Sequence, residues 1–119
     1  FKHLERNLFV FNGFDEMLVA GLSMGADGGI GSTYNFMPGI ILDIYNNFVK
    51  GDIQAAQAAQ EKADEIITAI IPYGTFQMEK EILNDLGIHV GGCRKPFLPL
   101  SAEGKKKAKE IADRLTSGV

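Results

Sequence analysis

Two carboxylates stand directly after an apolar stretch near the start of the chain. Asp15 and Glu16 follow the run Leu-Phe-Val-Phe at 8–11, across an Asn-Gly step at 12–13. Four successive apolar residues are typical of a strand that is covered on both faces, as in a parallel sheet. Ligand sites of parallel α/β folds collect at the carboxyl ends of strands. Because ionised carboxylates accept hydrogen bonds, the pair suits a ligand rich in hydroxyl groups.

The same position also fits a purely structural role. Acidic residues in the first turn of a helix are stabilised by the helix dipole. Residues 15–25 are expected to form such a helix, which would end at Gly25. Taken alone, the position of Asp15 and Glu16 slightly favours a helix start over a ligand site.

A second candidate is the glycine-rich run 28–33, Gly-Gly-Ile-Gly-Ser-Thr. Its glycines let backbone approach a ligand closely, and Ser32 and Thr33 add hydroxyl groups. Such a run could also cradle a phosphate, but the acids at 15–16 would repel a phosphate dianion. Close backbone packing explains the glycines equally well, so the run alone is a weak signal.

The remaining reactive side chains indicate no further site. His3 and His89 are far apart and lack a partner at metal-ligand spacing, so we expect no metal site. Cys93 is the single cysteine, which excludes an intrachain disulfide and suits a reducing compartment. The cations of the segment 93–97 are expected on a surface turn.

Composition excludes two classes of partner. Hydrophobic residues make up 45% of the 119 residues and charged residues 23%, with a net charge of −3. That balance, without a basic face, argues against nucleic-acid binding. No apolar run approaches the roughly 20 residues that span a bilayer, and the cytoplasm is the default location. The lysines at 105–109 are expected on the solvated face of a last helix.

A strand, a helix, a second strand and four helices are expected to position these residues. The expected ranges are a helix tail at 1–6, a strand at 7–13, a helix at 15–25, a glycine-rich strand and loop at 26–35, and helices at 37–51, 52 to about 72, 75–86 and from Ser101 on, with an irregular segment at 88–100. The helical faces expected to point inward carry Ile40, Ile41, Ile44, Phe48, Val49, Ala55, Ala56, Ala59, Ala63, Ile66, Ile67, Ile70, Ala108, Ile111, Ala112 and Leu115. Two parallel strands cannot bury themselves, so we infer part of a larger α/β fold.

Two motifs at this spacing resemble those of the N-acetylneuraminate lyases, the sialic acid aldolases. They are Asn-Gly-Phe-Asp-Glu at 12–16 and Gly-Ala-Asp-Gly-Gly-Ile-Gly-Ser-Thr-Tyr-Asn at 25–35, and features at 50–60, 78–83 and 93–97 agree. The resemblance covers almost the whole chain as a single segment, 1–119. It implies the C-terminal portion of a TIM (β/α)8 barrel, with strands 7 and 8 and their helices in 1–50 and extra C-terminal helices in 51–119.

The resemblance also implies a function. The family consists of class I aldolases that cleave N-acetylneuraminate to N-acetylmannosamine and pyruvate through a Schiff base, without a cofactor and typically as homotetramers. Its Schiff-base lysine lies on strand 6, so no catalytic residue is expected in this chain. The implied contacts to the sugar polyol are the backbone of Gly13 and Gly31, the carboxylates of Asp15 and Glu16, and the hydroxyl of Ser32.

Two alternatives stay open at this stage. The large helical share and the missing nucleophile also suit a non-catalytic fragment or assembly module. A related pyruvate-dependent aldolase with another substrate is the second alternative. The join near Arg6-Asn7 is several residues shorter than the family pattern, which implies a deletion, an engineered join or residues missing from the numbering.

Overall fold

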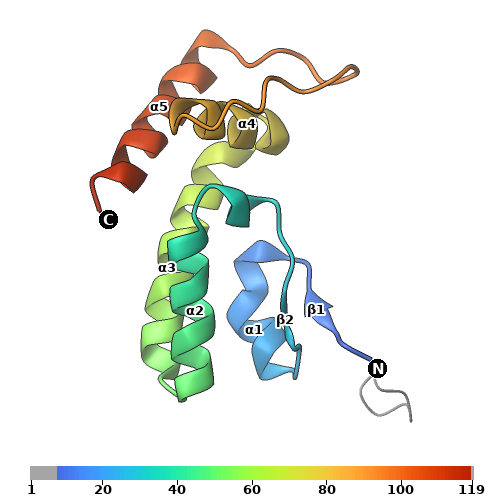
Figure 1. Cartoon of the computed structure of the whole chain (residues 1–119), viewed down its shortest axis with the longest axis vertical. Helices are drawn as coiled ribbons and strands as arrows, with labels where there is room; N and C mark the ends of the chain where they lie inside the picture. Colours follow the sequence, from blue (N-terminus) through green and yellow to red (C-terminus); the bar gives the residue numbers. More distant parts are fainter. Residues whose placement is uncertain (1–7, 119) are drawn as a thin grey trace. The chain divides into compact units, whose positions relative to one another are not determined.

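The computed structural model describes residues 8–118. The chain forms two compact units, Phe1–Asp64 and Glu65–Val119, whose boundary falls within helix α3 (Ile53–Ile70) (Figure 1). The predicted helix tail at 1–6 and its join to the first strand lie outside the described residues, as does His3.

Two short parallel strands form the sheet of the first unit. Strand β1 (Phe11–Asn12) pairs with β2 (Gly28–Gly29), with Phe11 opposite Gly28 and Asn12 opposite Gly29. The predicted parallel strand–helix–strand order is confirmed, but β1 is shorter than the predicted range 7–13. In the described residues β1 has a single neighbouring strand, so its outer edge makes no ladder, and Phe9 is 81% exposed.

The segment between the strands forms the predicted helix with a tighter first turn. A 3-10 turn, η1 (Asp15–Met17), leads directly into α1 (Leu18–Ser23). Leu18 and Leu22 are buried. Gly25 follows with a φ of +90°, a left-handed conformation that suits the predicted glycine stop. After β2, a further 3-10 turn, η2 (Thr33–Asn35), precedes the next helix.

Helix α2 (Pro38–Lys50) buries three of the five residues expected to face inward, Ile40, Ile41 and Ile44. Phe48 is half-buried. The prediction for Val49 is wrong, since its side chain is 66% exposed. Val49 lies nine residues after Ile40, which is about two and a half helical turns and therefore the opposite face. The predicted cap of α3 is confirmed, because Asp52 Oδ1 accepts a hydrogen bond from the Ala55 backbone at 3.0 Å.

The second unit is helical. After the end of α3 it contains η3 (Ile71–Tyr73), α4 (Thr75–Asp85) and α5 (Ala102–Thr116), with the irregular segment expected before α5. Ser101 caps α5 as predicted, with its Oγ accepting from the Gly104 backbone at 3.0 Å. Its core is formed by Ile66, Ile67, Ile70, Met78, Ile82, Ala108, Ile111 and Ala112.

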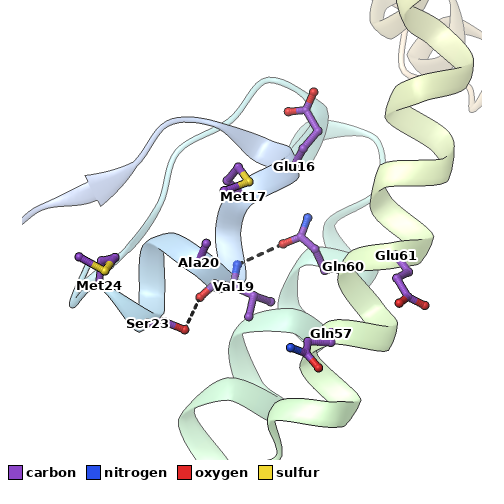
Figure 2. A pocket seen from close by; sticks show the side chains of 9 residues that line it. All are labelled: Glu16, Met17, Val19, Ala20, Ser23, Met24, Gln57, Gln60 and Glu61. Carbon is purple, nitrogen blue, oxygen red and sulfur yellow. Dashed lines mark hydrogen bonds between the residues drawn. The ribbon is translucent and has the colours of Figure 1, made fainter.

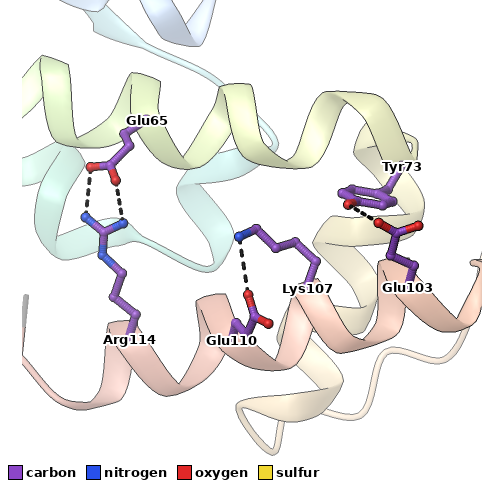
Figure 3. Close-up of polar contacts among 6 residues, drawn as sticks. All are labelled: Glu65, Tyr73, Glu103, Lys107, Glu110 and Arg114. Carbon is purple, nitrogen blue, oxygen red and sulfur yellow. Dashed lines mark hydrogen bonds and ion pairs between the residues drawn. The ribbon is translucent and has the colours of Figure 1, made fainter.

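Polar contacts on the surface of this unit join its helices (Figure 3). The Arg114 guanidinium donates to both carboxylate oxygens of Glu65, at 2.8 and 2.9 Å. This contact lowers the pKa of the Glu65 carboxyl. Tyr73 donates its hydroxyl to Glu103 at 3.2 Å. Lys107 and Lys109 of α5 pair with acids of the same helix at the surface, as expected for a solvated face.

Candidate functional site

Asp15 joins the ends of the two strands. It follows β1, is only 8% exposed, and accepts hydrogen bonds at Oδ2 from the Thr33 hydroxyl at 2.6 Å and the Thr33 backbone at 3.3 Å. Thr33 belongs to the glycine-rich run that follows β2. The two motifs that stand apart in the sequence therefore meet at the carboxyl end of the sheet. A carboxylate offers about four lone-pair positions, so the Thr33 contacts do not exhaust its capacity to accept hydrogen bonds.

Gly31 lies directly against this carboxylate. A Cβ atom added at Gly31 would overlap the Asp15 side chain, first at Oδ1 and then at Cγ and Oδ2. The absence of a side chain at position 31 is thus what allows the carboxylate to occupy its place. Close packing and a ligand site are therefore compatible explanations of Gly31. The group that packs against this glycine is the Asp15 carboxylate, which is itself a candidate ligand-binding group.

Glu16 stands in a different environment from Asp15. It is half-buried and lines a groove of about 690 Å³ between the start of α1 and helix α3. Figure 2 shows its carboxylate at one end of this groove and the side chains of α3 along the other wall. The groove lining consists of Glu16, Met17, Val19, Ala20, Ser23, Met24, Gln57, Gln60 and Glu61. The acidic pair therefore presents one buried and one accessible carboxylate.

The other two predicted contact residues are accessible. Gly13 is exposed, and nothing lies within 4 Å of a Cβ built on it. Ser32 is exposed as well, and its backbone carbonyl accepts a hydrogen bond from the Asn35 side chain at 2.9 Å. Gly13 directly follows β1, and Ser32 lies next to Thr33 in the segment after β2, so all five predicted residues follow the carboxyl ends of the two strands.

The sequence-based prediction missed Gln60. This buried residue of α3 donates to the Asp15 backbone carbonyl at 3.0 Å, although 45 residues separate the two. A signal was present, because Gln60 lies one turn after Ala56 on the otherwise apolar stripe of the helix. A buried glutamine on such a stripe requires hydrogen-bond partners. Gln60 also donates to Asp64, and burial raises the pKa of the Asp64 carboxyl. The hydrogen bond from Gln60 lowers this pKa, whereas the charges of Glu16 and Glu61 raise it further.

Tyr34 brings a covered hydroxyl close to the site. The side chain is half-buried, but the hydroxyl oxygen is fully covered and makes no hydrogen bond of good geometry within residues 8–118. Burial, together with the Asp15 charge, raises the pKa of Tyr34 to about 12, while the Asn12 side chain acts in the opposite direction. Tyr34 is therefore neutral at any physiological pH.

We expect the Tyr34 hydroxyl to titrate late and to link stability to alkaline pH. Between pH about 10 and 12 the folded chain keeps this proton while the unfolded chain loses it, so stability falls as pH rises through that window. The ring Cζ chemical shift of isotopically labelled tyrosine should follow this titration in the complete protein. The Tyr34→Phe variant assigns the signal and should lose less stability over the same window. Titration of this signal near pH 10 would contradict the expectation.

Residues 8–118 contain no group of three or more His, Cys, Asp or Glu side chains that could hold a metal ion. None of their helices has the length and apolar character needed to cross a bilayer.

These features define a class of protein. A parallel strand–helix–strand unit with polar groups gathered at the carboxyl ends of both strands is the building block of α/β proteins, barrels among them. Residues 1–115 match the model of the Dihydrodipicolinate synthetase family. The chain belongs to this family and carries part of its barrel fold.

Its relatives include several N-acetylneuraminate lyases. The enzyme of Escherichia coli O1:K1 is 39% identical over 110 residues, which are 92% of this chain and 37% of the relative. The lyase of Fusobacterium nucleatum, solved with pyruvate, has a TM-score of 0.85 and 36% identity over 90% of this chain and 36% of that one. CdNal of Clostridium difficile, solved with mannosamine, has a TM-score of 0.87 and 34% identity over 92% and 38%. The chain thus spans little more than a third of the length of these relatives.

Proposed function

We propose that this chain is the C-terminal, sugar-binding part of an N-acetylneuraminate lyase. In the complete protein, strands 7 and 8 of the barrel would correspond to β1 and β2, residues 1–50 to the last two βα units, and residues 51–119 to the C-terminal helical extension. The observation that carries the proposal is the Asp15 carboxylate at the end of β1, held by Thr33 and packed against Gly31.

The site chemistry suits a neutral polyol. Hydroxyl groups of the sugar tail would donate to the carboxylates of Asp15 and Glu16 and exchange hydrogen bonds with the Ser32 hydroxyl. The backbone at Gly13 and Gly31 would allow the tail to approach closely. Two acids at the mouth of the site would disfavour anionic tails such as sugar phosphates. Relatives solved with pyruvate and with mannosamine support a substrate that unites a keto acid with an amino sugar.

The cleavage itself requires a lysine from outside this chain. A class I aldolase forms a Schiff base between a lysine and the keto carbon, and the iminium then accepts the electron pair of the broken carbon–carbon bond. No lysine occurs between residues 3 and 49, which hold both strands and their carboxyl ends. We therefore assign substrate selection to this chain and covalent chemistry to the remainder of the complete protein.

Exposed apolar residues count against an independent assembly module. In the first unit Phe9, Phe11 and Ile30, which lie on or next to the two strands, are 81%, 52% and 68% exposed. A free-standing domain rarely leaves several large apolar side chains uncovered in one region. Further barrel strands beside β1 and β2 would cover this part of the sheet, and a homotetramer of the complete protein is the assembly that the family resemblance supports.

The experiment compares the complete protein with the isolated 119 residues. Pyruvate release from N-acetylneuraminate, measured with a coupled dehydrogenase, should be readily detected for the complete protein and absent for the isolated chain. A related aldolase of different specificity would instead act best on keto acids that lack the polyol tail. Activity of the isolated chain would refute the assignment of the lysine to another part of the protein.

A further inference from the structure

Gln60 is the single described side chain of α3 that bonds to the turn carrying both acids and to the start of α1. Its Nε2 donates to the Asp15 carbonyl at 3.0 Å and to Asp64 Oδ1 at 2.8 Å, and its Oε1 accepts from the Val19 backbone at 3.1 Å. The side chain is 8% exposed. Figure 2 shows it reaching from α3 across to α1.

The partners of Gln60 allow one orientation of its amide. Both protons of Nε2 are used, each by an oxygen acceptor, and Oε1 faces a backbone donor. Exchanging the amide nitrogen and oxygen would set an acceptor against the Asp15 carbonyl and the Asp64 carboxylate, and a donor against the Val19 N–H. The amide is therefore fixed by chemistry as well as by packing, and Asp64 is the group that locks it from the α3 side.

The start of α1 lacks a cap of its own. The residues before η1 and before α1, Phe14 and Met17, make no side-chain capping hydrogen bond. Val19 is the second residue of α1. A local capping side chain would normally accept a hydrogen bond from the N–H at this position. Gln60 takes over this role from a helix that is distant in sequence. It thereby ties the first turn of α1, and the acids just before it, to α3.

We propose that Gln60 is a positioning residue that fixes the Asp15-Glu16 turn for recognition of the polyol tail, with Asp64 orienting its amide. The proposal rests on the proposed function. Gln60 itself touches the backbone of the turn and the Asp64 carboxylate, so it acts through the acids. Loss of Gln60 would leave the carboxylates in the chain but no longer held in one arrangement, which costs affinity for the tail and spares the chemistry on pyruvate.

The test uses Gln60→Met in the complete protein, with Gln54→Met as the matched control. Both residues lie on α3, and Gln54 is exposed and outside the groove. We expect Gln60→Met to lower kcat/KM for N-acetylneuraminate about 10- to 100-fold, mainly through KM, because small misplacements of binding groups cost this much. Borohydride trapping of the pyruvate Schiff base should be unchanged. Gln54→Met should match the wild type in both assays.

Two variants of Asp64 and a second measurement distinguish loss of positioning from misfolding. Asp64→Leu removes the acceptor that orients the amide and should shift KM in the same direction by a smaller factor, whereas Asp64→Asn retains an acceptor and should stay near wild type. Hydrogen exchange at the Val19 amide should accelerate in Gln60→Met. An active wild type with unchanged KM in Gln60→Met, or equal loss of pyruvate trapping, overturns the positioning role alone. An inactive wild type overturns this role together with the proposed function.

Discussion

Replacing Gly31 with alanine is expected to be the most damaging single-methyl change in the site. The added Cβ would overlap the Asp15 carboxylate, while Gly31 lies outside the positive-φ region where side chains are strained for backbone reasons. The substitution is therefore expected to act by a steric clash with the Asp15 carboxylate and not by straining the backbone. Either the carboxylate or the strand end must move, and overpacking of this kind costs about 1–3 kcal/mol.

In the complete protein, Gly31→Ala should lower kcat/KM for N-acetylneuraminate by about 10²-fold, the usual consequence of displacing a binding group by an ångström. Steady-state pyruvate release measures this loss. Gly39→Ala is the matched control, since nothing lies within 4 Å of a Cβ at that exposed helical position. It should retain full activity and gain slight stability, because alanine is a better helix former than glycine.

A double variant separates steric displacement from other effects. Asp15→Ala removes the atoms that the new methyl group would overlap, so stability lost in Gly31→Ala should be partly regained in the double variant. Non-additivity of this kind is the signature of residues in direct contact. Additive stability changes would show that Gly31→Ala acts on something other than the Asp15 carboxylate.

Local sequence signals predicted the elements around the site and left out the contacts that lock it. A helix ends at Gly25 and another begins after Asp52, as predicted, because stop and cap signals act within a few residues. The meeting of Asp15 with Thr33 follows from parallel strands that end at the same edge of a sheet. The helix boundaries needed nothing more than neighbours in the sequence, whereas the hydrogen bond between Asp15 and Thr33 was not predicted.

Three outcomes were not predicted correctly, and two of them depended on tertiary structure. The length of β1 is set by its pairing with β2, which residues 7–13 alone do not encode. Val49 resembled a core residue by its side chain and was excluded by helical phase alone. The position of Gln60 on an alanine stripe could have indicated that it is buried. Its partner Asp15 could not be inferred, because 45 residues separate the two. Contacts between residues that are distant in the chain cannot be inferred from a single sequence.

Replacing Asp15 with alanine should separate recognition of the sugar from chemistry on the keto acid. The variant loses a charged acceptor for the polyol hydroxyls and leaves the Thr33 hydroxyl without its 2.6 Å partner. Removal of a hydrogen bond to a charged group costs about 1.5–3 kcal/mol, which corresponds to about a 10- to 150-fold fall in kcat/KM for N-acetylneuraminate. Trapping of the pyruvate Schiff base should persist, because pyruvate has no polyol tail to lose.

The matched variant is Asp15→Asn, which keeps the shape and one acceptor oxygen for Thr33 but removes the charge. Charge-assisted hydrogen bonds are roughly twice as strong as neutral ones, so Asp15→Asn should fall between wild type and Asp15→Ala for the sugar substrate. Equal activity of Asp15→Asn and wild type would assign Asp15 a structural role at the sheet end. Equal loss of pyruvate trapping and sugar cleavage in Asp15→Ala would do the same. The graded order, with trapping intact, is the result that only a polyol-binding carboxylate produces.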